Sequence, residues 1–174
     1  FVLETLGALL ADARAVHGRP AAATRRLPIP DSVGQLIDAR LDKLSDSALR
    51  LAHVAALAGQ DFDLELSAAV LDLRMLDLAR PWRELQAANV MRDESFAHDL
   101  VFEATLRSVP PALGRPLHRS IARCLADRAA PAERIAFHWH RAEEWVQAAD
   151  SYLKAATHAL TLSRRAEELL LLRS

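Results

Sequence analysis

Residues 90–104 read Val90-Met91-Arg92-Asp93-Glu94-Ser95-Phe96-Ala97-His98-Asp99-Leu100-Val101-Phe102-Glu103-Ala104, and this stretch decides how the chain is organised. Two short extended arms, 90–92 and 95–96, flank a polar pair at 93–94, which is typical of a β-hairpin turn. Beyond the second arm the apolar spacing becomes helical, with one predicted face formed by Leu100, Val101, Ala104 and Leu106. The stretch therefore predicts a short hairpin that runs directly into a helix.

The start of that helix carries two polar side chains that could take part in binding. Asp99 stands where we expect the helix N-cap, and an aspartate there accepts a backbone N–H and suits the positive end of the helix dipole. His98 precedes it, and a helix N-terminus beside an imidazole is a ready site for an anion such as phosphate. A simpler interpretation is that His98 only caps the helix or lies in the core.

The segment Phe96-Ala97-His98-Asp99-Leu100-Val101 resembles the His-Asp motif that closes the winged-helix domain of STAND-class signal-transduction ATPases, which are related to AAA+ ATPases. In that family the histidine contacts the β-phosphate of bound ADP and holds the protein in its inactive state. The resemblance implies this ADP-sensing role for His98, with Asp99 beside it. The chain has Ala97 where the immune-receptor members commonly carry Met, and Phe96 supplies the apolar anchor one place earlier.

The composition is that of an ordinary globular chain. It has 174 residues, of which 51% are hydrophobic and 26% charged, and a net charge of −1. This charge does not draw the whole chain to nucleic acid or to an anionic membrane, although it leaves room for a local basic face. Cys124 is the single cysteine, and no apolar run reaches the roughly 20 residues of a membrane span. We expect a cytoplasmic protein without membrane contact, cut from a longer chain.

Proline and glycine positions divide the chain into four parts. Residues 1–17 carry an amphipathic helix over 1–16, which the resemblance makes the last helix of an ATPase lid. Residues 18–30 are a linker with one glycine and three prolines, and residues 31–109 show the order of helices and hairpin of a winged-helix domain. Residues 110–174 carry small and large residues in a pattern that resembles tetratricopeptide (TPR) repeats. The predicted fold is mainly α, a winged-helix domain with a small β-hairpin wing followed by TPR-like helical hairpins.

More detailed expectations concern single helices. The first winged-helix helix opens at Ser32 with a buried stripe, and the second ends at Gly59. A third helix covers 64–71, and Pro81 stands in the first turn of a fourth over 82–88. The stripe of the first helix consists of Val33, Leu36, Ile37, Leu41 and Leu44. Further helices are expected over 113–126, around 135–139, around 148–155 and over 163–172.

The chain shows no pattern for catalysis or metal binding. The Walker A and Walker B motifs are absent, so we expect this segment not to be an enzyme and to bind no nucleotide by itself. His138 and His140 are two residues apart on a helix, so their side chains diverge and do not share a metal ion. Asp61 and Asp63 are interpreted as caps rather than as metal ligands.

The resemblance implies a regulatory segment of an ATP-dependent transcription regulator. An upstream ATPase core would hold ATP or ADP, and the winged helix would couple that nucleotide to downstream helical repeats. The resemblance further implies an inducer or protein partner on the repeats, homo-oligomerisation on activation, and DNA contact through a separate output domain, such as a LuxR-type one.

Two other functions stay open. A DNA-binding winged helix would use Arg80 and Arg83 on its recognition helix and Arg92 in its wing, partly offset by nearby glutamates. A TPR-type protein-interaction scaffold would use a groove formed by Trp139, Trp145 and Tyr152, although these aromatic side chains are as readily explained as the core of a helix pair.

Overall fold

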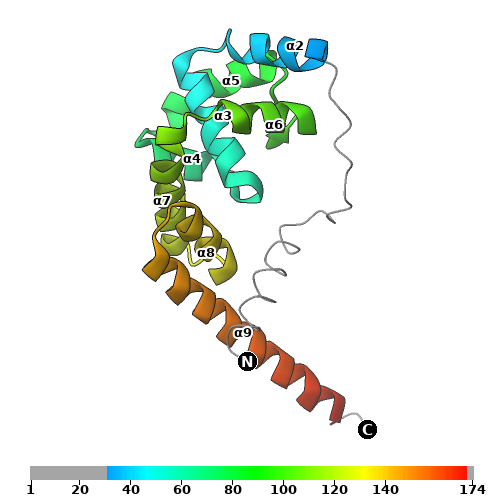
Figure 1. The fold of residues 1–174 in the computed structure, drawn as a ribbon, viewed down its shortest axis with the longest axis vertical. Coiled ribbons are helices and arrows are strands. Elements are labelled where there is room, and N and C mark those ends of the chain that lie inside the picture. The colour runs from blue at the N-terminus through cyan, green and yellow to red at the C-terminus, as the bar shows by residue number, and fades with distance from the viewer. Residues whose placement is uncertain (1–30, 172–174) are drawn as a thin grey trace.

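The structure, a computed structural model, describes residues 31–171, which are mainly helical with one small antiparallel hairpin (Figure 1). The expected lid helix over 1–16 and the linker over 18–30 lie outside the described residues. The elements are α2 (Asp31–Leu41), α3 (Asp46–Ala58), the 3₁₀ turn η1 (Gly59–Asp61), α4 (Leu64–Leu71), the 3₁₀ turn η2 (Met75–Leu78), α5 (Ala79–Ala87), β1 (Met91–Arg92), β2 (Ser95–Phe96), α6 (Asp99–Ser108), α7 (Pro111–Asp127), α8 (Ala132–Arg141) and α9 (Trp145–Leu171). Among these elements no helix is both long and apolar enough to cross a bilayer.

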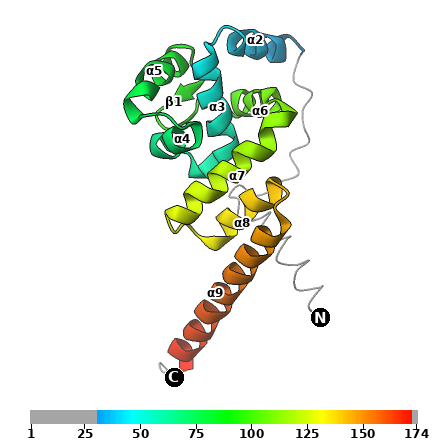
Figure 2. The ribbon, with the colours of Figure 1, turned by 90° about the vertical axis from the view of Figure 1, so that its left-hand side faces the viewer.

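Helix α3 is the centre of the fold. Every residue from Leu51 to Ala58 is buried, because α3 is surrounded by α5, α6, α4 and α7 (Figure 2). Its many alanines allow these neighbours to approach closely. Its N-terminal half contributes to a core shared with α2, α5, the hairpin and α6, and its last turn packs against α4 and α7. The helix therefore connects the hairpin side of the molecule to the C-terminal helices.

The predicted hairpin is confirmed. Met91 pairs with Phe96 and Arg92 with Ser95, which leaves Asp93-Glu94 as a two-residue turn. Asp93 has a φ of 53°, a left-handed conformation that aspartate tolerates better than most residues. Met91 is buried at 2% exposure, so the hairpin is fixed to the core from its first strand.

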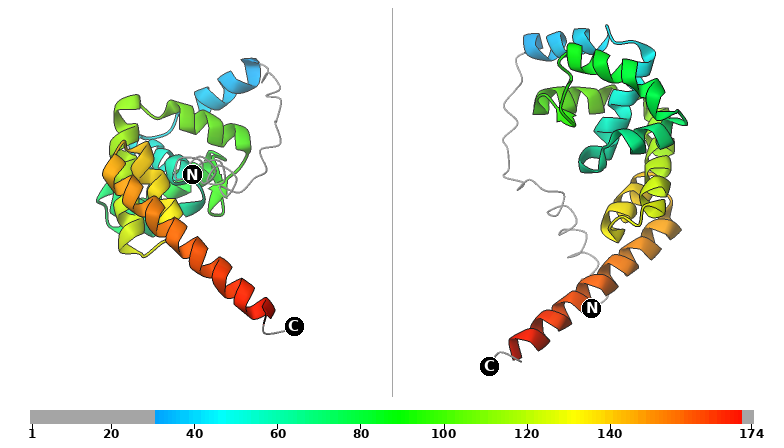
Figure 3. Two further views of the ribbon diagram at one scale, coloured as in Figure 1. Left: turned by 60° about the horizontal axis from the view of Figure 1, so that its bottom comes forward. Right: turned by 180° about the vertical axis from the view of Figure 1, so that it is seen from behind.

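Helices α7, α8 and α9 follow one another as packed neighbours, and α9 extends away from the other described helices (Figure 3). The expected separate helix over 163–172 is wrong, because α9 is continuous from Trp145 to Leu171. No Gly or Pro occurs within that range, so nothing in the local sequence ends the helix. The exposed side chains Val146, Leu153 and Leu160 recur every seven residues on α9.

Three smaller expectations are also wrong. Leu36, expected in the buried stripe of α2, is 68% exposed. Among the residues of that stripe whose exposure is described, only Ile37 and Leu41 are buried. Helix α5 begins at Ala79 and not at residue 82, although Pro81 does lie in its first turn, where it is buried. On α6 the buried residues are Val101, Ala104 and Thr105, whereas Leu100 and Leu106 are exposed at 38% and 39%.

Gly59 ends α3 and supports a first testable prediction. Its φ of 60° and ψ of −120° are strained for any residue with a Cβ, so Gly59→Ala is expected to lower the free energy of unfolding by about 1 kcal/mol. Gly34, inside α2, is the matched control, because an added Cβ there meets nothing within 4 Å. We expect Gly34→Ala to raise stability by about 0.5 kcal/mol. Denaturant unfolding measures both values, and equal values for the two variants would contradict the prediction.

Candidate functional site

The hairpin brings His98 to the start of α6 as an exposed side chain. Its backbone is extended, with φ −153° and ψ 149°, and its carbonyl accepts bonds from the N–H groups of Val101 and Phe102 at 3.0 and 3.1 Å. These features make His98 the N-cap, although its imidazole forms no capping bond. Asp99, expected as the N-cap, is instead the first helical residue, where its carboxylate still suits the helix dipole. The expected site residues are thus adjacent and exposed, with their roles in the cap shifted by one position.

The backbone around His98 is held firmly. The Ala97 N–H donates to the carbonyl of Val90 at 3.0 Å, which closes the base of the hairpin. The rings of Phe96 and Phe102 meet edge to face at 5.4 Å on either side of the turn into α6. Val101, one turn on, is buried in the core. The imidazole therefore projects from a rigid support, which favours a defined contact with another surface.

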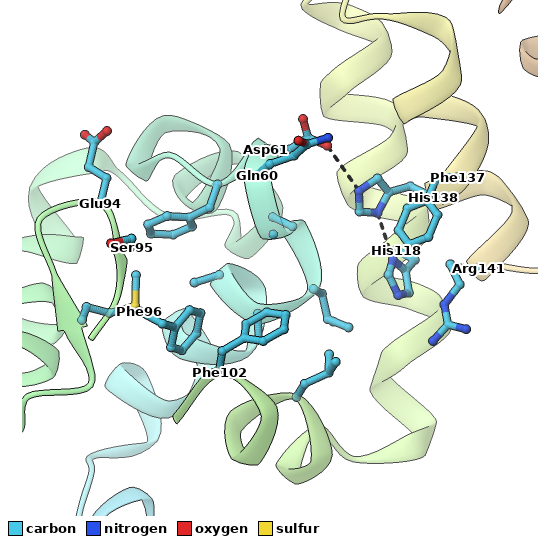
Figure 4. Close-up of a pocket in the computed structure, with 18 of the residues that line it drawn as sticks. Gln60, Asp61, Glu94, Ser95, Phe96, Phe102, His118, Phe137, His138 and Arg141 are labelled. Atoms are coloured by element: carbon cyan, nitrogen blue, oxygen red, sulfur yellow. Dashed lines mark hydrogen bonds and ion pairs between the residues drawn. The ribbon is translucent and has the colours of Figure 1, made fainter. Parts of the chain in front are cut away.

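A pocket of about 720 Å³ lies beside this turn, between the hairpin, the start of α6, the end of α3, and helices α7 and α8 (Figure 4). Asp99 lines it and His98 does not. The hairpin side provides aromatic surface, and the α7–α8 side provides His118, His138 and Arg141. No pattern in the sequence indicates this pocket, because its walls come from segments far apart in the chain.

A row of interacting polar side chains, mostly buried, forms the wall of the pocket opposite the hairpin. The Asp61 carboxylate, in η1, pairs with the guanidinium of Arg134, and its Oδ2 lies 3.6 Å from Nε2 of His138. Nδ1 of His138 lies 2.9 Å from Nδ1 of His118, so one ring donates to the other (Figure 4). The side chains of Asp61 and His138 are only 3% and 1% exposed. This row of polar side chains therefore links η1 to both α7 and α8.

The environment of His118 keeps its ring neutral. Burial, followed by electrostatic interaction with His138 and Arg141, lowers the pKa of His118 to about 3. Sequence reasoning missed this residue, although a signal was present: His118 falls on the apolar face of α7 that carries Ile121, Ala122 and Leu125.

The expectations for the other acidic and histidine residues have mixed outcomes. Asp63 caps α4, because its Oδ1 accepts the Leu66 N–H at 2.5 Å, whereas Asp61 forms the buried pair instead of a cap. His138 and His140 do diverge: His140 faces the rings of Trp145 and Tyr152 at 5.3 and 6.4 Å. Trp145 is 60% exposed, so it is not a core residue. No cluster of three metal-ligating side chains occurs among the described residues.

The arginines expected to contact DNA are exposed on α5 and on the neighbouring strand β1. Arg83 donates to the carbonyl of Ala79, and Arg92 donates weakly to Asn89 at 3.4 Å. Arg80 lies close enough to Glu84 to influence its carboxylate electrostatically. Glu84 itself accepts two bonds from Ser45, from the backbone N–H and from Oγ, both at 2.6 Å, and the resulting pKa of Glu84 is lowered. The carboxylate of Glu84 therefore mainly holds Ser45 at the start of α3, and it neutralises the positive charge of the nearby arginines less than expected.

Comparisons of the chain with protein-family models, with curated proteins and with solved structures gave no match.

Proposed function

We propose that this chain is the regulatory segment of a larger ATP-dependent signalling protein, a transcription regulator of the STAND class. In this proposal residues 31–109 form a winged-helix domain that senses whether an ATPase core holds ADP or ATP. Residues 110–174 begin a TPR-like array that passes on the signal of an inducer or protein partner. The proposal is supported chiefly by the position of His98. Its exposed imidazole lies at the N-terminus of α6, on a rigid backbone, and forms no capping hydrogen bond.

The chemistry of that position suits a phosphate. The dipole of α6 favours an anion at its N-terminus, and the His98 side chain can donate a hydrogen bond to a phosphate oxygen. A charge-assisted hydrogen bond to a β-phosphate contributes about 1.5–3 kcal/mol, which is enough to change a two-state equilibrium about ten- to a hundredfold. Contact with ADP through His98 would therefore hold the protein in its closed state, and loss of that contact would release it for oligomerisation.

The packing around α3 supports coupling between the two parts. Val101 and Ala104 of α6 share a core with the first half of α3, whose last turn packs against Ile121 and Leu125 of α7. A movement of α6 with the nucleotide would thus reach α7 through one buried helix. The uncovered residues on α9 support the array, because a repeat helix needs apolar residues on the side that meets the next repeat.

The test is calorimetric titration of ADP and ATP into the parent protein that contains the ATPase core. We expect His98→Ala to weaken ADP binding tenfold or more, to change ATP affinity little and to leave the fold intact. His158→Ala, an exposed histidine on α9, is the matched control and should change neither affinity. Equal ADP affinity in wild type and His98→Ala would refute the proposal, and DNA would then be the next ligand to test through Arg80, Arg83 and Arg92.

A further inference from the structure

Two polar groups on the α7–α8 wall of the pocket lack partners among the described residues. His118 is 5% exposed, and its Nδ1 is occupied by His138, which leaves Nε2 without a hydrogen bond. Arg141, which lines the same wall, forms no ion pair within the part of the chain that the structure describes. The two side chains lie near each other in Figure 4, and Arg141 is close enough to lower the pKa of His118. An imidazole nitrogen without a hydrogen bond, on a ring that is otherwise buried, and an arginine without an ion pair together indicate a site for a polar ligand group.

The opposite wall of the pocket combines aromatic surface with a few polar residues, Glu94, Ser95 and Asp99. Phe96 and Phe102 present their rings there, and the end of α3 contributes small side chains and Leu57 between the two walls (Figure 4). Glu94 is the acidic residue of the hairpin in this view, and its carboxylate points away from the rings. The size of the pocket falls in the range that holds a small organic molecule. A ligand would therefore place its apolar body against the hairpin and its polar head against α7 and α8.

The polar end is suited to a carboxylate. The guanidinium of Arg141 donates in a fork that matches carboxylate geometry. Nε2 of His118 is a second donor when His138 donates from both of its ring nitrogens, from Nε2 toward the Asp61 carboxylate and from Nδ1 to Nδ1 of His118. A second negative charge on the ligand would be repelled at the opposite wall, because the carboxylate of Asp99 lines the pocket there. A ligand with one anionic end is therefore favoured over one with two.

We propose that this pocket binds a small monocarboxylic acid with an aromatic or branched aliphatic body. The carboxylate pairs with Arg141 and His118, and the body packs on Phe96 and Phe102. Because the walls belong to the hairpin and α6 on one side and to α7 and α8 on the other, the ligand bridges the two parts of the fold. The site does not depend on the nucleotide role of His98, which is not among the lining residues.

The test is calorimetric titration of the 174-residue chain with phenylacetate, indole-3-acetate and 4-methylpentanoate, against the uncharged phenylacetamide and the cation phenethylamine. We expect at least one acid to bind at least tenfold more tightly than the amide and the amine. Arg141→Gln should lower the affinity for that acid tenfold or more, and His118→Asn should lower the affinity as well. Arg107→Gln, an exposed arginine on α6 that does not line the pocket, is the matched control and should bind like wild type.

Three results would overturn this proposal: no binding of any of the acids, tighter binding of the amine, or equal affinity of wild type and Arg141→Gln. Arg141 is exposed, so its substitution tests the site without disturbing the core. The measurement uses no nucleotide, so its failure is separable from failure of the ADP experiment on His98.

Discussion

Asp61→Asn is expected to lower the free energy of unfolding by about 3 kcal/mol. The substitution keeps the volume of the side chain but removes the charge that faces Arg134 and His138. Removing one partner of a buried ion pair is costly, because the other charge stays buried without compensation. Arg134 is 30% exposed, which places the expected loss at the lower end of the range for buried pairs. Denaturant unfolding followed by circular dichroism at neutral pH measures it.

Glu65→Gln is the matched control for this prediction. Glu65 also pairs with an arginine, Arg128, but at 3.8 Å and with a side chain that is 76% exposed. Water screens such a pair, so its loss should change stability by less than about 0.5 kcal/mol. A similar small loss for Asp61→Asn would show that the buried chain does not hold η1 to α7 and α8.

The features predicted well from the sequence are those set by neighbouring residues. The expected helix over 64–71 agrees with α4 because Asp63 caps its start and Leu71 is followed by a left-handed Asp72. The hairpin follows from its polar turn, and the end of α3 follows from Gly59, whose backbone suits glycine. Each of these signals lies within a few residues of the structure that it predicts.

The features missed depend on contacts between distant segments. Nothing near Asp61 in the sequence indicates that Arg134 and His138 will meet it, since η1 and α8 become neighbours only when α7 packs on α3 and α4. The pocket has the same origin. Periodicity also misplaced Leu36, because the pattern of a helix shows which residues share a face but not how much of that face a neighbour covers.

Lowering the pH from about 7.5 to about 5.0 is expected to reduce the free energy of unfolding by up to about 2 kcal/mol, because of His118. Its pKa is about 3 in the folded state, against an ordinary value of 6.5. Below pH 6.5 the unfolded chain therefore binds a proton at this ring that the folded chain does not bind. Stability is complete above pH 6.5 and falls by at most about 1.4 kcal/mol per pH unit until the pH reaches the folded pKa. Denaturant unfolding across this range measures the slope.

His118→Asn separates this effect from other titrations. Asparagine keeps a polar group near the position of Nδ1 for His138 but has no titrating ring, so the slope should become smaller. Burial also lowers the pKa of His53, which adds loss of the same sign and stays in the variant. The lowered pKa values of Asp77 and Glu84 contribute mainly below about pH 4.5. An unchanged slope in His118→Asn would mean that the folded ring takes up a proton freely.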